Sequence, residues 1–186
     1  MPSSVKFTYE DFLNFPNDGK RHEIIDGEHY VTPSPNTKHQ RIVTRLTAAL
    51  VHCLEQHPIG EVFVAPLDVV FSDLDVVEPD LLYISRERAS VLTEQNVRGA
   101  PDLAVEILSP STRKTDEVTK RKLYERFGVG EYWVVDPELE TIKVYRRVGE
   151  AFERVSELGA ESGDELTTPL LPDFSVTVAE LFASPM

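Results

Sequence analysis

The spacing of apolar residues along the chain separates helices from strands. Residues 37–56 carry apolar side chains at every third or fourth position, as one face of a helix does, and this spacing predicts the longest helix. A second helix is predicted over residues 115–127, because Thr115 or Asp116 can cap its first turn and Gly128 can end its last one. Each predicted helix has an apolar face that must pack against another element.

Shorter apolar runs, bounded by Gly, Pro and Asp, predict the strands. Residues 21–31 indicate a hairpin about Asp26-Gly27, a strong turn dipeptide. Two central strands, residues 79–85 and 101–108, are each opened by a Pro-Asp pair. The remaining predicted elements are a short helix over residues 9–15, strands over residues 61–71 (interrupted at Pro66), 131–136, 141–148 and 151–156, and a short closing helix.

The composition is typical of one globular domain, which we expect to span residues 1–186. With 186 residues and 41% hydrophobic content, the chain can bury a sizeable core. Cys53 is the one cysteine of the sequence, and a single cysteine excludes disulfide scaffolds and cysteine-rich zinc sites. Because Cys53 lies among helix-spaced apolar residues, it is predicted to be a core thiol. The sequence shows no transmembrane run and no signal-peptide pattern, so we expect a cytoplasmic protein without membrane contact.

Charge is unevenly distributed along the chain. The net charge of −13 argues against a protein that coats nucleic acid non-specifically, because phosphate binding depends on Lys and Arg. Between residues 113 and 126 the sign reverses, since six basic residues against three acids give a local net charge of +3. If a polyanion binds this protein, we expect it to bind near that segment.

Two acids on the central strands indicate a divalent-metal site. Asp80 opens one strand, and Glu106 lies inside the other, on the same face as Ala104 and Leu108. A carboxylate among apolar neighbours is costly to bury unless it is paired or binds a metal. Mg²⁺ is typically held by one or two carboxylates together with water and substrate phosphate. The spacing equally allows a structural Glu106 that forms a salt bridge across the sheet.

The lysine that would complete such a site does not stand beside Glu106. The residue two positions further points to the same face of the strand, but that residue is Leu108. On the following helix, Lys120 forms one stripe with Asp116 and Tyr124 at the edge of the face expected to pack on the sheet, and its side chain can reach back to the carboxylates. Spacing alone favours an ordinary surface lysine paired with Asp116.

The order of these segments resembles that of a known family. The segments "HEIIDGE", "SPNTKHQRIVTRL", "EPDLLYIS", "PDLAVEILSPST" and "KRKLYERFGVGEYWVVDP" are similar in order to those of the restriction-endonuclease family called Uma-two, from about residue 7 to residue 182. Members of that family are similar in fold to the PD-(D/E)XK nucleases. The resemblance implies an α/β fold with a restriction-endonuclease-like core, in which helices flank a central mixed β-sheet, and an N-terminal β-hairpin extension.

The resemblance also implies a catalytic set. It makes Asp80 and Glu106 the two acids of the site and Lys120 the signature lysine, moved onto the following helix. With the main-chain carbonyl of Ile107, the two acids would hold Mg²⁺ or Mn²⁺, which lowers the pKa of a bound water and stabilises charge on the phosphate. Lys120 would position that water or offset the developing negative charge.

Three further residues are candidates for additional members of the site. Glu23 matches a family carboxylate, although a structural partner within the hairpin is at least as well supported. His39 matches a histidine often present in the family, but a helix-end hydrogen bond is favoured over a contact with phosphate or with the site. Tyr124 lies on the helix of the migrated lysine. Asp102 shares a strand face with the second acid but is expected to have a strand-edge role.

These observations leave three functional hypotheses. The resemblance implies a metal-dependent endonuclease that hydrolyses DNA phosphodiester bonds as a homodimer. The acidic composition supports the alternative of a non-catalytic module with the same fold, used for binding or assembly. A hydrolase of a smaller phosphate ester is the third hypothesis. Serine-hydrolase and P-loop functions are excluded, because the sequence contains neither of their glycine-rich motifs.

Overall fold

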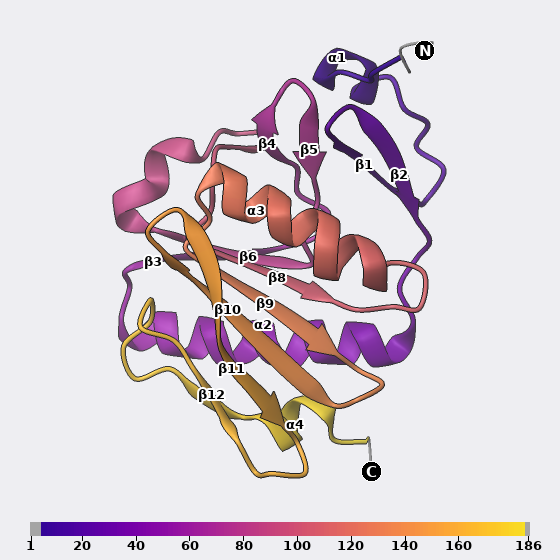
Figure 1. The fold of residues 1–186 in the computed structure, drawn as a ribbon. Helices are drawn as coiled ribbons and strands as arrows, with labels where there is room; N and C mark the ends of the chain where they lie inside the picture. The colour runs from indigo at the N-terminus through magenta and orange to yellow at the C-terminus, as the bar shows by residue number, and fades with distance from the viewer. Residues whose placement is uncertain (1–4, 185–186) are drawn as a thin grey trace.

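A six-stranded mixed sheet forms the centre of the computed structural model, which describes residues 5–184 (Figure 1). The strand order is β11-β10-β9-β8-β6-β3, and β8 is parallel to β9 whereas all other neighbours are antiparallel. The strands are β3 (Gly60–Val64), β6 (Leu81–Ser85), β8 (Leu103–Ile107), β9 (Glu131–Asp136), β10 (Thr141–Val148) and β11 (Ala151–Gly159). The predicted central mixed sheet is confirmed, and the two Pro-Asp strands, β6 and β8, are neighbours in it.

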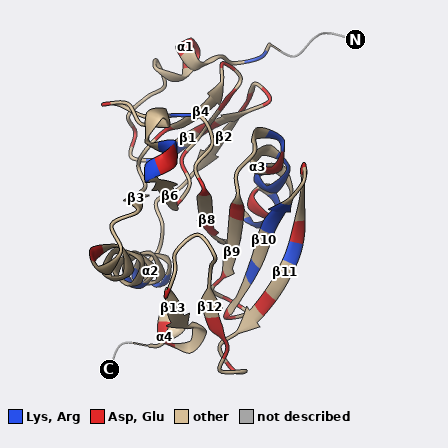
Figure 2. Ribbon diagram, turned by 90° about the vertical axis from the view of Figure 1, so that its left-hand side faces the viewer, with Lys and Arg blue, Asp and Glu red and all other residues tan. Residues whose placement is uncertain are grey.

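Different helices cover the two faces of this sheet (Figures 1 and 2). α2 (Thr37–Gln56) lies on one face, and α3 (Arg121–Phe127) lies on the other. The odd-numbered residues of β8 pack in the core cluster that contains α2, whereas Ala104 and Leu108 pack in the cluster that contains α3 residues. Glu106 therefore points to the α3 face, as its strand position predicts.

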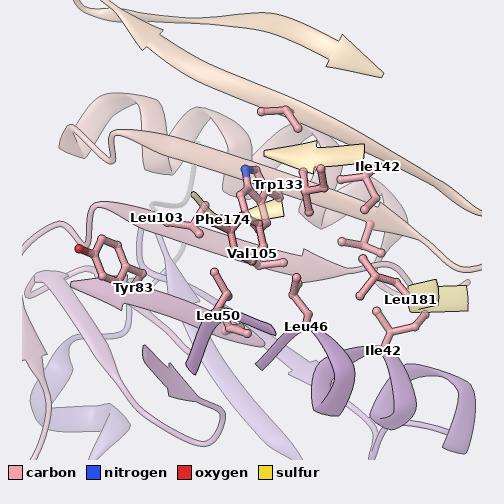
Figure 3. Close-up of a cluster of buried hydrophobic side chains, with 14 of the residues drawn as sticks. Ile42, Leu46, Leu50, Tyr83, Leu103, Val105, Trp133, Ile142, Phe174 and Leu181 are labelled. Carbon is pink, nitrogen blue, oxygen red and sulfur yellow. The ribbon is translucent and has the colours of Figure 1, made fainter. Parts of the chain in front are cut away.

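The larger core lies between the sheet and α2 (Figure 3). Ile42 and Leu50 of α2 are fully buried in one cluster with Val105 and Trp133 of the sheet. Cys53 also lies in this cluster, which confirms it as a core thiol. The same core is closed by the C-terminal elements β12 (Glu165–Thr167), β13 (Ser175–Thr177) and α4 (Val178–Phe182).

The predicted N-terminal hairpin belongs to a second sheet of five strands. Asp26 and Gly27 both have positive φ, 51° and 77°, as a two-residue type I′ turn requires. β1 continues into the rest of that sheet by pairing Ile24 with Val76 of β5. In sheet order the strands are β2 (Glu28–Thr32), β1 (Arg21–Ile25), β5 (Asp75–Val77), β4 (Val69–Ser72) and β7 (Val97–Arg98). The sequence pattern does not predict β5 and β7, because runs of two or three residues carry no periodicity.

Local signals account for several element boundaries. α3 ends where Gly128 adopts a φ of 83°, as predicted. The turn that precedes α3, Thr115–Lys120, is π-helical, and the predicted α-helix over residues 115–127 is corrected to that extent. α1 (Tyr9–Phe12) begins with a capping box between Thr8 and Asp11, and it ends three residues before its predicted end.

The two sheets are connected at Pro66, where the sequence predicts that the strand is interrupted. That residue lies between β3 and β4, and the Ala65–Pro66 peptide bond is cis.

The polar segment between β6 and β8 forms a 3-10 helix, Arg86–Val91, followed by β7. Across residues 5–184, no helix is long and apolar enough to cross a membrane.

Candidate active site

Asp80 and Glu106 lie at the ends of neighbouring strands and line one cavity. β6 and β8 pair with Leu81 opposite Val105, so the next positions outward, Asp80 and Glu106, are level with each other. Their exposed fractions are 3% and 2%, and both line a cavity of about 350 Å³. The antiparallel pairing thus brings together two acids that are far apart in the sequence.

Three groups hydrogen-bond to Asp80. Arg21 Nη2 donates to Oδ1 at 2.9 Å, and the Ile107 N–H donates to Oδ2 at 2.7 Å. His39 Nε2 lies 3.1 Å from Oδ2, and because an ionised carboxylate only accepts, Nε2 carries the hydrogen. Burial raises the pKa of Asp80, but these three donors outweigh that effect and hold the pKa at about 2. Asp80 is therefore ionised at neutral pH.

Glu106 has the opposite electrostatic surroundings. Lys120 Nζ and the Tyr124 hydroxyl both donate to Oε1, at 3.0 and 2.7 Å. Complete burial raises the pKa of the Glu106 carboxyl well above its usual value; the Lys120 charge opposes this shift, and neighbouring acids add to it. Because both bonds end on Oε1, the oxygen available to a ligand in the cavity is Oε2.

Lys120 lies at the centre of a cluster of acids. Its Nζ is 2.8 Å from Glu23 Oε1, 3.0 Å from Glu106 Oε1 and 3.6 Å from Asp116 Oδ1. Burial lowers the pKa of this ammonium, but the three carboxylates outweigh the effect and raise the pKa above its usual value. The alternative of an ordinary surface lysine is wrong, although the pairing with Asp116 that it assumes is present.

The depth of Lys120 is a correction to its predicted position at the edge of the buried face. Only 2% of the residue is exposed, and Asp116 and Tyr124 of the same stripe are buried with it. The stripe faces the sheet. Burial of its charges is compensated, because Lys120 pairs with Asp116 and donates to Glu106, and the Tyr124 hydroxyl also donates to Glu106. Asp116 and Lys120 both lie in the π-helical turn, a feature often found at functional sites.

Comparison with known proteins assigns the chain to a family. The model of the family Uma2, described as "Putative restriction endonuclease", matches residues 9–179. The chain belongs to the Uma2 family. The fold resembles that of a putative nuclease belonging to DUF820 from Anabaena variabilis ATCC 29413, with a TM-score of 0.78 and 23% identity over 95% of this chain and 97% of that chain. The restriction-endonuclease-like fold that the sequence predicts is thereby confirmed.

Two other comparisons give no information on the function of this chain. The type IIG restriction endonuclease BpuSI matches with a TM-score of 0.43 and 18% identity, over 77% of this chain and 15% of that chain. No curated protein matches the chain. Membership of the Uma2 family supports a nuclease-like function. The roles of individual residues are inferred from the geometry of the cavity.

The segments that carry the Uma2 resemblance place His39 at the wall of this cavity and Glu23 in the acid cluster around Lys120. Glu23 Oε1 accepts bonds from Lys120 and, at 2.9 Å, from the Glu78 N–H, so it joins the cluster and has a structural partner as well. Both interpretations of His39 hold in part, because its ring contacts Asp80 of the site. Its backbone N–H makes the helix-end hydrogen bond, to the Asn36 side chain at 2.9 Å.

Sequence reasoning missed Arg21 and Asp116 as members of the site. Arg21 contacts Asp80 and lines the cavity. The signal was its place on β1 two residues before Glu23, since alternate residues of a strand share a face. Burial raises the pKa of Asp116 to about 6, against the lowering effect of Lys120. The signal for Asp116 was its spacing of four residues from that lysine.

Asp102 and Leu108, the other two residues near β8 that the sequence analysis considered, contribute no polar group to the cavity. The Asp102 carboxylate accepts the Ser85 N–H at 2.7 Å and lies 3.4 Å from Arg88, which confirms its strand-edge role. Leu108, at the position where a lysine would stand beside Glu106, is 4% exposed and packs in the cluster on the α3 face. Among the described residues, Lys120 supplies the ammonium that lies within ion-pair distance of Glu106.

The oxygen donors fit a divalent cation held by two carboxylates. Among residues 5–184, no three His, Cys, Asp or Glu side chains are arranged to hold a metal by themselves. Because Mg²⁺ is typically held by one or two carboxylates with water and phosphate, Asp80 and Glu106 are the side chains that would hold such a cation here. Ile107 directs its N–H, and hence its carbonyl, toward Asp80. Continuing the β6–β8 register outward places Pro79 opposite Ile107, and proline has no N–H to occupy that carbonyl.

Proposed function

We propose that this protein is a metal-dependent endonuclease that hydrolyses DNA phosphodiester bonds. The observation that carries the proposal is the placement of Asp80 and Glu106 on one cavity, with the Ile107 backbone bonded to the first of them. Membership of the Uma2 family supports the nuclease function. In this proposal the two carboxylates and the Ile107 carbonyl hold Mg²⁺ or Mn²⁺.

The two carboxylates have different tasks in the proposed reaction. When bound, the cation supplies Lewis acidity and lowers the pKa of a water molecule that can attack phosphorus. Asp80 contributes a full negative charge, because its pKa of about 2 keeps it ionised. Glu106 offers Oε2, because Oε1 is engaged by the helix that carries Lys120.

Lys120 is assigned an electrostatic role. Because its carboxylate neighbours raise the pKa of the ammonium, Lys120 keeps its proton at neutral pH and is a poor general base. Its ammonium orients Glu106 and offsets the negative charge that develops on the phosphate. Tyr124 supports the same carboxylate from the next turn, and His39 and Arg21 orient Asp80.

Nicking of supercoiled plasmid DNA with Mg²⁺ or Mn²⁺ tests the proposal. We expect chelation of the metal, Asp80→Asn and Glu106→Gln each to abolish nicking, because each removes the cation or one of its ligands. Asp102→Asn is the matched control, since Asp102 lies on the same strand face as Glu106 and outside the cavity. Cleavage that survives in either Asp80→Asn or Glu106→Gln contradicts the assignment.

A non-catalytic role in binding or assembly is the second candidate. One observation favours it: each proposed ligand already has an internal cation, Arg21 at 2.9 Å from Asp80 and Lys120 at 3.0 Å from Glu106. A metal must compete with these partners. If this role is correct, neither Mg²⁺ nor Mn²⁺ produces nicking or a thermal shift, whereas a metal-dependent thermal shift that Glu106→Gln removes favours the nuclease.

The homodimer stays a prediction. It rests on the resemblance to the family and on the small size of one acidic chain relative to a DNA duplex. Light scattering on the purified protein measures the mass directly, and a mass of one chain at all concentrations contradicts the prediction.

A further inference from the structure

The proposed active site lies at the bottom of a small cavity. Asp80, Glu106 and Lys120, which line its floor, are only 2–3% exposed. The cavity volume, about 350 Å³, is at the small end of the range for ligand pockets in proteins. The exposed prolines that line its rim are Pro33, Pro35 and Pro110. A phosphate group must pass this rim before it can contact the carboxylates.

Prolines and hydrogen bonds restrain the rim of the cavity. It consists of the segments at residues 32–36, 109–112 and 137–138, which follow β2, β8 and β9. Lys38 Nζ donates to the Pro137 carbonyl at 2.5 Å and so ties the start of α2 to the segment after β9. The hydroxyls of Ser109 and Thr112 are bonded to each other at 3.0 Å. Because proline fixes φ, the proline-rich segments have few ways to open.

The surface near the cavity offers limited positive charge to a duplex. Three of the six basic residues between positions 113 and 126 form ion pairs with acids of this chain, namely Arg113, Lys120 and Arg126. Affinity for a duplex depends on many Lys and Arg side chains that neutralise phosphates, and the chain has a net charge of −13. The segment expected to bind a polyanion is therefore half neutralised.

We infer that the substrate of the proposed nuclease is an unpaired strand of DNA and not the interior of a duplex. The inference rests on the proposed function and names its substrate class. A single backbone can pass the proline rim and bring one phosphate to Asp80 and Glu106, whereas in a duplex the paired strand blocks the approach to so deep a floor. Arg21 and Lys38 also line the cavity and carry positive charge there.

Rates of cleavage on three matched substrates test this inference. They are a single-stranded oligonucleotide, the same strand in a linear duplex, and that duplex with a short unpaired bubble. Each base-pair step that must be unstacked slows cleavage roughly tenfold, so a duplex that has to open two steps should be cut about 100-fold more slowly than the single strand. In the third substrate we expect cuts within the bubble.

Lys38→Ala tests whether the rim sets this preference. Removing the bond to Pro137 loosens the rim, so the ratio of single-strand to duplex rates should fall severalfold. Lys122→Ala is the matched control, because Lys122 is an exposed lysine on α3 that does not line the cavity, and it should keep the wild-type ratio. A ratio that Lys38→Ala leaves unchanged contradicts the role assigned to the rim.

The possible failures are distinguishable. A linear duplex cut as fast as the single strand overturns the inference and leaves the proposed nuclease standing. Absence of metal-dependent cleavage of every substrate, including supercoiled plasmid, overturns both. Cleavage of the single strand and of the bubble with little cleavage of the linear duplex supports both.

Discussion

Asp80 and Glu106 line the same cavity and are almost equally buried, yet the pKa values of their carboxyl groups shift in opposite directions. Asp80 receives three hydrogen bonds, two of them from side chains of β1 and α2, and its pKa falls to about 2. Glu106 shares Lys120 with two other acids, and its pKa rises. Burial raises the pKa of both carboxyl groups, and the donors around each one decide whether that rise is outweighed, as it is at Asp80, or remains, as it does at Glu106.

The comparison divides the site into two regions of unlike charge. Around Asp80, a guanidinium and an imidazole serve two acids, because Arg21 also lies 3.9 Å from Glu78. Around Glu106, three acids have one ammonium, because Glu23 and Asp116 use the same lysine. Repulsion among the acids is thus concentrated on the α3 side, where a single substitution should have the largest effect.

Removal of the shared ammonium should be the most damaging change. Lys120→Met leaves three buried acids without their cation, and we expect the free energy of unfolding at pH 7 to fall by about 3–5 kcal/mol. Urea denaturation measures this loss. Lys122→Met, an exposed position on the same helix, is the matched control and should change stability by no more than about 0.5 kcal/mol. Similar values for the two variants would refute the shared-ammonium picture.

The two regions should also differ in how stability depends on pH without metal. The Asp80 pKa is lowered from 3.8 to about 2, so its contribution, about 2 kcal/mol, is present above pH 3.8 and is lost as pH falls toward 2. The Asp116 pKa is raised from 3.8 to about 6, so its contribution, about 3 kcal/mol, is present below pH 3.8 and is lost as pH rises through 6.

Urea denaturation between pH 3 and pH 7 in the presence of a chelator separates these two contributions. We expect Asp116→Asn to remove part of the loss of stability between pH 4 and pH 6, because the raised pKa values of Glu78 and Glu106 contribute the remainder. Asp80→Asn should remove the loss below pH 4 instead. If both variants change the same part of the pH profile, the opposite shifts of the two regions are wrong.

Loss of the Asp80 guanidinium should cost less than loss of the shared ammonium. In Arg21→Met the carboxylate keeps the His39 ring and the Ile107 N–H, so we expect a loss of about 2 kcal/mol at pH 7. The same variant should raise the pKa of Asp80, which NMR titration of its side-chain carboxyl measures. A destabilisation equal to that of Lys120→Met would remove the asymmetry between the two regions.

The smallest effect is expected at Tyr124. Tyr124→Phe removes the hydroxyl that donates to Glu106 Oε1 at 2.7 Å but keeps the ring that packs on the sheet, so stability should fall by about 1 kcal/mol. Thermal unfolding with Tyr145→Phe as a control for a partly exposed tyrosine measures the difference. Equal effects at the two positions would mean that the Glu106 bond adds little.

Much of the scaffold could be predicted because its signals are periodic. The helix over residues 37–56 is found with its predicted bounds, and the alternation along β8 correctly places Glu106 on the α3 face. The pairing of the two Pro-Asp strands then brings Asp80 level with Glu106. Strands as short as β5 and β7 could not be predicted, because two or three residues carry no periodicity; β5 is held by both β4 and the more distant β1, and β7 by β4.

The polar interior of the site was harder to predict. The stripe of Asp116, Lys120 and Tyr124 is visible in the sequence, but three polar residues usually mark a solvated face. Their burial depends on Glu23 and Glu106, which come from two different strands, and on the π-helical turn. Charges that are compensated by residues distant in the sequence leave no local pattern. For the same reason, the contact of Arg21 with Asp80 was not predicted.

Titration calorimetry with Mn²⁺ at neutral pH tests the proposed metal site most directly. The wild-type protein and the variants Asp80→Asn, Glu106→Gln and Asp102→Asn should be compared, with circular dichroism to confirm that each is folded. We expect binding to the wild-type protein and to Asp102→Asn, and its loss in both Asp80→Asn and Glu106→Gln. Binding that persists in either of those two variants, or no binding to the wild-type protein, would contradict a metal site shared by Asp80 and Glu106.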